Sequence, residues 1–386
     1  MLLQIVILIL TFFLYFDFKN KTNIRIKIDL YRKKLIQFVC ILLIIQSGLR
    51  HLSIGADTYG YALMYNQVDN DSWENIWNAF VKYYMAGATD KGTKDLGYTL
   101  LQKFFCSIGF NFRFFFIFVA VFFFVAYGRL LYKYTRTMEE IIISILLYEA
   151  LFYSFYSITG IRQVIATAGV LYIVPYAIDK KFIKFFVGLL IFATIHKSCL
   201  LFIPFYFFGY IKNPRLVLYV SLILFLPMFS LGRKLATYLI AGTTFEQYSQ
   251  FLEGYESSGA YTFSAFIILI CFCVIYSWKK LEKEGRINNY FAICVAFAVV
   301  LTPLVMIDPN NMRIVHYYSI YTLFVLPKFC STIENGYLGT IHKVVIVALL
   351  LSIIQHHYTY GFFWEDMYLN PIYGITHTIS DFNILN

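Results

Sequence analysis

Three arginines of this chain stand at the ends of apolar segments, where a cationic side chain can meet an anionic group. Arg50 lies in SGLRHLSIGADTYGY, Arg162 in SITGIRQVIATAG and Arg313 in DPNNMRIVHYYS. A guanidinium presents several N–H donors in a planar fork that matches phosphate oxygens. We expect Arg162 and Arg313 to open helices, whose free N–H groups and dipole also favour anions. The set indicates a phosphate or diphosphate site, although any single arginine could simply anchor a helix end to lipid headgroups.

Other polar side chains accompany the arginines and would supply acid–base chemistry. Asp57 and His196 are the candidates for a general base that takes a proton from a hydroxyl group. We favour Asp57, because His196 could instead contact phosphate as a cation. The residues expected to orient the substrate are Tyr59, Gln163, Ser198 and Tyr317. The same neighbourhoods also contain Lys197, Asp308, Asn310, Asn311 and His316.

The elements that must position these residues are membrane helices. Hydrophobic residues make up 60% of the 386 positions and charged residues 14%, far from the balance of a soluble domain. About twelve apolar runs are long enough, or nearly so, to cross a bilayer. They are residues 1–18, 35–48, 113–131, 140–158, 161–178, 182–195, 198–211, 215–231, 261–278, 288–307, 312–327 and 342–356.

Charge sets the expected orientation. The first run is followed by KNKTNIRIKIDLYRKK, which we place in the cytoplasm with the N-terminus outside, so that the run is an anchor rather than a cleaved signal. Alternation of sides then leaves most of the 32 lysines and arginines inside and all the polar groups named above outside. The net charge of +10 therefore reflects membrane orientation, and we expect no nucleic-acid partner.

The stretch between Lys184 and Lys212 tests this topology. A single helix there would bury His196 and Lys197 and would move the later basic loops outside. We therefore predict two short helices with their hinge at IHKS, at or below the outer surface.

We expect one integral membrane domain, residues 1–386, with two large external segments. The segment 49–112 contains two amphipathic stretches, SWENIWNAFVKYY and DLGYTLLQKFFCSIG, which suit helices on the outer leaflet or over a cavity. The second external segment, 232–260, is polar and aromatic. Aromatic side chains in these segments could belong to an interfacial belt or could stack on sugar rings.

Some chemistries find no support in the sequence. It has no phosphate-binding glycine loop and no dinucleotide fingerprint, and the cysteines lack a metal-binding spacing. We expect neither a cofactor nor a metal, and we interpret the cysteines as small core residues. Glu149 lies within an apolar run, so it should face the bundle, either in a structural pair or as part of the site.

Five motifs, in order over about residues 48–320, resemble the EpsG family of Wzy-like polysaccharide polymerases. The stretch from Arg50 through GADTYGY resembles the family's R…GxDxxxY signature, and KDLGYTLL its acidic-x-Gly-Tyr/Phe stretch, with Asp95 where glutamate is more common. ITGIRQVIA resembles the IRQ motif and IHKSCLLFIP the HxS segment. MRIVHYY resembles the late arginine and tyrosine motif.

The resemblance implies an all-α, GT-C-like polytopic enzyme of the bacterial cytoplasmic membrane with an outward-facing site. It would join oligosaccharide repeat units carried on undecaprenyl diphosphate, with Arg162, Arg313 and Arg50 stabilising the departing diphosphate. It further implies a substrate-contacting role for Asp95, and a flippase and a chain-length regulator as partners. Three alternatives remain open at this point: a lipid-linked oligosaccharide flippase, a membrane acyltransferase and a purely structural membrane protein.

Overall fold

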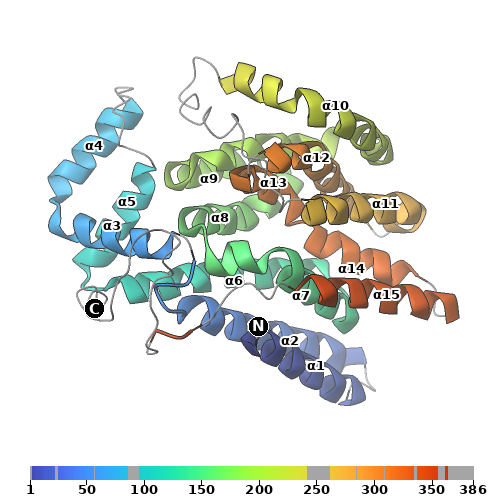
Figure 1. Ribbon diagram of the computed structural model, residues 1–386. Coiled ribbons are helices and arrows are strands. Elements are labelled where there is room, and N and C mark those ends of the chain that lie inside the picture. Colours follow the sequence, from blue (N-terminus) through green and yellow to red (C-terminus); the bar gives the residue numbers. More distant parts are fainter. Residues whose placement is uncertain are drawn as a thin grey trace. The chain divides into compact units, whose positions relative to one another are not determined.

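The computed structural model describes residues 2–21, 25–55, 57–85, 95–240, 261–283, 285–307, 309–333, 337–354 and 361–363. These residues form helices throughout, and they contain no β-strand (Figure 1). A single bridge joins Arg50 to Phe362. The prediction of an all-α protein is therefore confirmed.

The chain divides into two compact units, each described here by itself. The first comprises Met1–Tyr172, Gly188–Lys197 and Val344–Asn386. The second comprises Ile173–Val187 and Ser198–Lys343.

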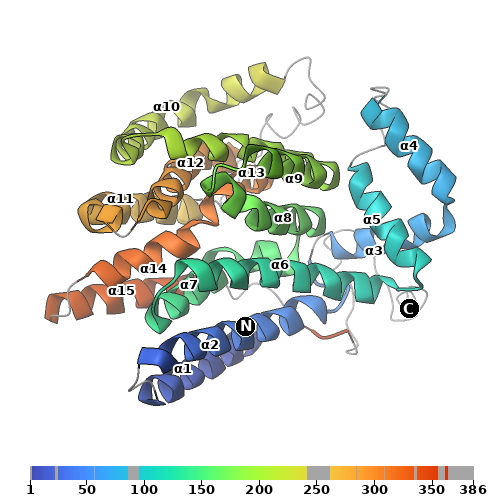
Figure 2. The same cartoon turned by 180° about the vertical axis from the view of Figure 1, so that it is seen from behind.

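Long apolar helices form the frame of the first unit. They are α1 (Leu2–Lys21), α2 (Arg25–Gly48), α6 (Phe112–Tyr134) and α7 (Met138–Leu151), followed by a π-helical turn, Ser154–Ile158. Both views show α1 and α2 side by side (Figures 1 and 2). Helix α2 also packs along α6, where small residues allow close approach. A Cβ atom added at Gly128 would lie 2.8 Å from the Cys40 Sγ atom.

Three short helices lie within the predicted external segment 49–112. Helices α4 (Trp73–Met85) and α5 (Leu96–Ser107) match the two amphipathic stretches. Helix α3 (Thr58–Asn70) was not predicted, because its sequence shows no clear apolar periodicity. Both α3 and α4 pack against α5.

The predicted hinge between two short helices is confirmed. After α8 (Ile161–Ile178), helix α9 (Phe182–Ile195) ends one residue before His196, and a 3₁₀ helix, η2 (Lys197–Tyr210), follows. A 3₁₀ helix has three residues per turn, so side chains three apart stand in one row. Cys199, Phe202, Phe205 and Phe208 form such a row and are all buried. The rings of Phe202 and Phe205 stack with centroids 4.4 Å apart.

The second unit contains further helices whose bounds differ from the predicted ones. They are α10 (Pro214–Ile240), α11 (Tyr261–Lys283), α12 (Ile287–Ile307), a short 3₁₀ turn (Pro309–Asn311), α13 (Met312–Ser319) and α14 (Thr322–Thr332). Helix α15 (Tyr337–Ile353) begins in the second unit, and its residues from Val344 onward belong to the first unit. The expected run 312–327 is broken after Ser319. Helix α10 extends into the expected external segment 232–260, of which residues 241–260 lie outside the described residues.

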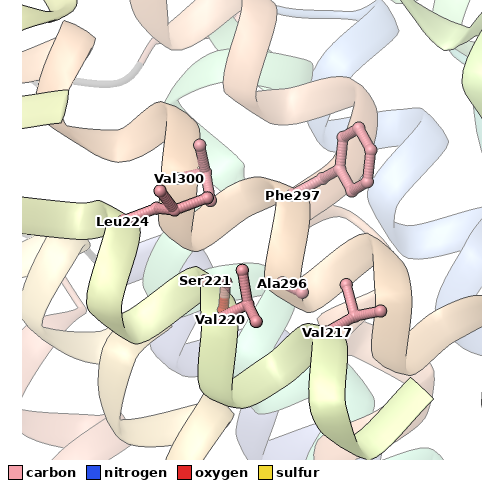
Figure 3. Close-up of a pocket in the computed structure, with 7 residues that line it drawn as sticks. All are labelled: Val217, Val220, Ser221, Leu224, Ala296, Phe297 and Val300. Carbon is pink, nitrogen blue, oxygen red and sulfur yellow. The ribbon is translucent and has the colours of Figure 1, made fainter. Parts of the chain in front are cut away.

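A cavity of about 190 Å³ lies between α10 and α12 (Figure 3). Its one polar side chain, Ser221, donates its hydroxyl hydrogen to the Leu218 carbonyl, so the walls present apolar groups. The lining residues are Val217, Val220, Ser221, Leu224, Ala296, Phe297 and Val300.

Five helices of the described ranges are long and apolar enough to cross a membrane: Leu3–Lys21, Phe112–Tyr134, Ile161–Ile178, Tyr261–Lys283 and Ile287–Met306. Shorter apolar helices occupy Phe182–Ile195, Pro214–Met228 and Gly339–Ser352. The length and apolar composition of these helices support the interpretation that the chain is a membrane protein. The count of about twelve spans and the GT-C-like arrangement stay predictions.

Candidate functional site

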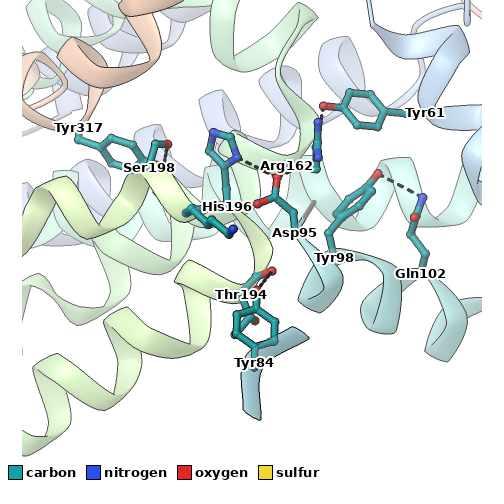
Figure 4. Close-up of polar contacts among 11 residues, drawn as sticks. Tyr61, Tyr84, Asp95, Tyr98, Gln102, Arg162, Thr194, His196, Ser198 and Tyr317 are labelled. Carbon is teal, nitrogen blue, oxygen red and sulfur yellow. Dashed lines mark hydrogen bonds and ion pairs between the residues drawn. The ribbon is translucent and has the colours of Figure 1, made fainter. Parts of the chain in front are cut away.

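Asp95 is the centre of a polar cluster in the first unit (Figure 4). It directly precedes α5 and is 6% exposed. Its backbone is left-handed, with φ 58° and ψ 49°, a region that few non-glycine residues occupy and that Asp and Asn tolerate better than most. Such local strain concentrates at functional sites. The carboxylate receives hydrogen bonds from two other segments of the chain.

Arg162 binds this carboxylate from the first turn of α8, so its predicted place at a helix N-terminus is confirmed. Its Nη1 donates to Asp95 Oδ2 at 2.8 Å, and its Nε donates to the Tyr61 hydroxyl at 3.1 Å. The side chain is 21% exposed. Nη2 makes no hydrogen bond to any residue that the structure describes. These two contacts therefore fix one edge of the guanidinium group, and Nη2 is left to donate a hydrogen bond to a ligand.

His196 occupies the hinge between α9 and η2. Its Nδ1 lies 3.3 Å from Asp95 Oδ2. Its Nε2 is buried and has no hydrogen-bond partner among the described residues. When Nδ1 carries the proton and donates to Asp95, Nε2 is the basic nitrogen. A carboxylate that orients a histidine in this way prepares it for proton transfer.

Lys197 adds a second cation beside the cluster. Its backbone N–H donates to Asp95 Oδ1 at 3.4 Å, and its ammonium lies 4.4 Å from the centroid of the Tyr83 ring. No carboxylate of the described residues forms an ion pair with it. Partial burial lowers the pKa of this ammonium, because the charged form loses hydration. Arg162 and Lys197 are thus two cationic residues among those that contact Asp95, the first through its side chain and the second through its backbone.

A glycine brings α5 close enough for these contacts. A Cβ atom added at Gly97 would lie 2.0 Å from Thr194 Oγ1 and 2.7 Å from the Thr194 carbonyl carbon. Such distances are impossible for a real side chain without displacement of one helix. The absence of a Cβ atom therefore lets the start of α5 reach the end of α9, where His196 follows.

Arg50 is buried, and its guanidinium donates hydrogen bonds to the protein itself. It is 2% exposed, and its guanidinium lies over the Phe116 ring at 4.1 Å. It donates to the carbonyls of Ser47, Ser157 and Ile158 at 2.8, 2.6 and 2.8 Å. The side chain therefore joins the end of α2 to the π-helical turn, and its role in substrate binding stays a prediction.

The predicted roles of Asp57 and Tyr59, at the start of α3, stay predictions. Asp57 directly precedes α3 and forms no hydrogen bond or ion pair with Asp95, Arg162 or His196. The tyrosine that contacts Arg162 is Tyr61, not Tyr59. The signature R…GxDxxxY places its tyrosine four residues after the aspartate, so the spacing itself points to Tyr61. Gln163 follows Arg162 on α8 and is 2% exposed.

The remaining candidates belong to the second unit. Ser198 donates to the Tyr317 hydroxyl at 3.2 Å, a pair also drawn in Figure 4. Arg313 lies in the first turn of α13, as predicted, and is half-buried. His316 is 1% exposed. Asp308 lies outside the described residues. The role of Arg313 stays a prediction.

Glu149 forms a pair distinct from this cluster. Its Oε2 accepts a hydrogen bond of 3.0 Å from Gln4 Nε2 of α1, and the carboxyl group is buried at 2% exposure. Of the two interpretations that the sequence left open, this contact favours the structural pair.

Sequence reasoning gave no site role to two residues that the structure brings to the cluster, Tyr61 and Lys197. The spacing of the signature was the available signal for Tyr61. For Lys197 the available signal was its position between His196 and Ser198, because the HxS segment does not specify the residue type there.

The long apolar helices define a helical membrane protein, and it contains a buried acid–histidine pair in contact with Arg162. The comparisons give this class a family: the EpsG family model matches residues 33–368, and the chain belongs to this family of Wzy-like polysaccharide polymerases. The family implies a glycosyltransferase-like polymerase. Searches of curated proteins and of solved structures find no match.

Proposed function

We propose that this protein joins oligosaccharide repeat units carried on undecaprenyl diphosphate, at the outer face of the bacterial cytoplasmic membrane. The observation that carries the proposal is the contact of Asp95 with both His196 and Arg162, at 3.3 and 2.8 Å. One carboxylate thereby positions a base and a phosphate-binding cation within the same cluster. A donor with its own diphosphate leaving group needs no nucleotide-binding fold.

In the proposed step, His196 Nε2 takes the proton of an acceptor hydroxyl group. The hydroxyl oxygen forms a bond to the anomeric carbon of the donor sugar, while the bond from that carbon to the diphosphate oxygen breaks. The diphosphate leaves with the electron pair. The proton on His196 then passes to water or to the released diphosphate. We prefer His196 to Asp57 as the base, because Asp95 can hold the imidazole in the tautomer that this step requires.

Arg162 and Lys197 would stabilise the negative charge that grows on the leaving group. A charge-assisted hydrogen bond contributes about 1.5–3 kcal/mol, so two cations could supply a substantial part of the barrier reduction. Arg162 offers the donor Nη2 for this contact, and the Lys197 ammonium has no carboxylate partner among the described residues. We retain Arg313 as a further phosphate ligand of the proposed mechanism, with Gln163, Ser198 and Tyr317 as residues that orient the substrate.

The proposal extends to the protein's surroundings. A flippase would deliver the lipid-linked units to the outer face, and a chain-length regulator would control the extent of polymerisation. Membrane lipid is the other expected partner, and the proposed chemistry involves no nucleic acid.

Reconstitution of the purified protein with synthetic lipid-diphosphate repeat units tests the proposal. We expect ATP-independent ladders of lengthened glycan together with release of undecaprenyl diphosphate. Arg162→Ala and Arg313→Ala should each abolish lengthening, whereas Arg162→Lys should retain part of it because the charge remains without the fork. Movement of the lipid across the bilayer without elongation would instead indicate a flippase.

Membrane orientation is tested separately from activity. Single cysteines at Lys197 and at the opposite end of α9, at Phe182, provide a matched pair for labelling with a membrane-impermeant reagent. We expect labelling of the Lys197 position from outside intact cells. Labelling of the Phe182 position instead would overturn the outward-facing site.

A further inference from the structure

Helix α4 carries an exposed aromatic face that the proposed chemistry does not use. Trp73, Trp77, Phe80 and Tyr84 recur at helical spacing. Trp73 is 44% exposed, Trp77 54% and Tyr84 37%, while Phe80 is half-buried. The Trp77 and Phe80 rings stack with centroids 5.6 Å apart, and the Phe80 and Tyr84 centroids are 4.8 Å apart. The rings of Trp77, Phe80 and Tyr84 therefore form a continuous row, and with Trp73 on the same helical face they are named here the aromatic row.

The aromatic row ends beside the Asp95 cluster, within the same unit. The Tyr84 hydroxyl donates to the Thr194 carbonyl at 3.4 Å, two residues before His196. The adjacent Tyr83 ring receives the Lys197 ammonium. Burial, with a smaller effect of the Asp95 charge, raises the pKa of Tyr84 to about 12, so its hydroxyl remains a hydrogen-bond donor at neutral pH. A ligand lying along the row would thus lead directly to the proposed base.

The composition of α4 favours a sugar over lipid as the occupant. A helix that lies in a membrane interface is typically rich in lysine and arginine on its polar face, whereas α4 has one lysine, Lys82, balanced by Glu74. Its exposed polar residues include Asn75 and Asn78, which can bond hydroxyl groups. The Trp73 indole is held by a hydrogen bond of 2.8 Å from Nε1 to Ser107 Oγ.

Helix α5 provides the contrast. Its exposed apolar side chains, Phe104 and Ile108, are pure hydrocarbon and are 52% and 50% exposed. They suit lipid contact. Tryptophan and tyrosine instead combine a flat apolar ring with a polar tip. Such a surface matches a pyranose ring, which has an apolar C–H face and hydroxyl groups around its rim.

We propose that the aromatic row binds the saccharide of the acceptor and directs its terminal sugar toward His196. This inference rests on the proposed function, because it places the glycan of that reaction. Sugar rings would stack on Trp77 and Trp73. The row would hold several sugar units while only the last one reacts.

Two substitutions of Trp77 separate sugar stacking from membrane contact. Trp77→Leu keeps an apolar side chain but removes the flat ring, whereas Trp77→Tyr keeps a ring. The probe is an oligosaccharide prepared by hydrolysis of the polysaccharide that the producing cells make, titrated against the full-length protein in nanodiscs. We expect Trp77→Leu to weaken binding about tenfold and Trp77→Tyr to change it less than threefold. Phe104→Leu on α5 is the matched control and should have no effect.

Fluorescence supplies a second readout that is independent of polymerase activity. Trp278→Phe and Trp364→Phe leave only the two α4 tryptophans of the four in the chain. The oligosaccharide should shift their emission, and brominated lipids should not quench it. Strong quenching by brominated lipids, with unchanged oligosaccharide affinity in Trp77→Leu, would overturn the inference and make the row a membrane anchor. Because both readouts report binding, they can succeed even where the proposed transfer reaction fails.

Discussion

Asp95→Asn tests the reasoning about the polar cluster most directly, because it removes the charge and keeps the shape. Asparagine also tolerates the left-handed backbone at this position. Its amide oxygen can still accept the Lys197 N–H. The changes are confined to the contacts with Arg162 at 2.8 Å and with His196 at 3.3 Å.

The expected magnitudes follow from the burial of these groups. The Asp95 side chain is 8% exposed and the Arg162 side chain 21%, so solvent screens the pair only in part. Loss of one charge-assisted hydrogen bond should destabilise the fold by about 1.5–3 kcal/mol. Loss of the oriented base should lower the rate by about 10²–10⁴-fold, the usual contribution of a positioned general base.

The assay compares initial rates of glycan lengthening in nanodiscs, normalised to folded protein. Asp17→Asn is the control, because its carboxylate pairs with Lys21 at the surface of α1 and such exposed pairs contribute little. His196→Gln should lower the rate by a similar factor, and the double variant should be scarcely slower than either single one. A rate for Asp95→Asn within threefold of the unmodified protein, or additive losses in the double variant, would refute an Asp95–His196 unit.

Three further predictions follow from individual contacts. Arg50→Ala removes a donor from the buried carbonyls of Ser47, Ser157 and Ile158, of which, among the described residues, only Ser157 keeps a second one, from Ser47 Oγ; it should lower the free energy of unfolding by about 3 kcal/mol, and an unchanged melting temperature would contradict this. Gly97→Ala should lower the polymerisation rate, because the added methyl group moves α5 away from Thr194. Gly60→Ala is the control, because Gly60 has open space around it and the rate should not change. Equal rates in the two variants would count against the close approach of α5 to Thr194. Because burial lowers the pKa of Lys197, the alkaline limb of the pH–rate profile should lie below the ordinary lysine value of 10.5. Lys197→Arg should move this limb to higher pH. A limb that does not move would exclude Lys197 as its source.

Features encoded over short stretches could be predicted from the sequence. The hinge at His196 could be predicted because the segment IHKS, which contains three polar residues, separates two short apolar runs. Helices α4 and α5 are visible from their apolar periodicity. Arg162 stands directly after an Ile that opens a long apolar run, so its place in a first helical turn is also local information.

Contacts between distant residues could not be predicted in this way. Asp95 and Arg162 are separated by 67 positions, and the motif resemblance pointed to both without indicating that they touch. Arg50 is a second case. Its sequence surroundings resemble those of a ligand-binding arginine, but only the packed structure reveals that carbonyls of two segments use its donors. Helix α3 was missed because its stability comes from packing on α5 rather than from its own pattern.

The 3₁₀ geometry of η2 makes this segment longer than an α-helix with the same number of residues. As an α-helix, its 14 residues would extend ~21 Å; at the 3₁₀ rise they extend ~28 Å, close to the ~30 Å of a hydrocarbon core. The tighter winding thus gives 14 residues a length that an α-helix reaches only with about 19 residues. The same winding fixes how the segment can change in length: three added residues would preserve the row that contains Phe202 and Phe205, whereas one would turn it by about 120°.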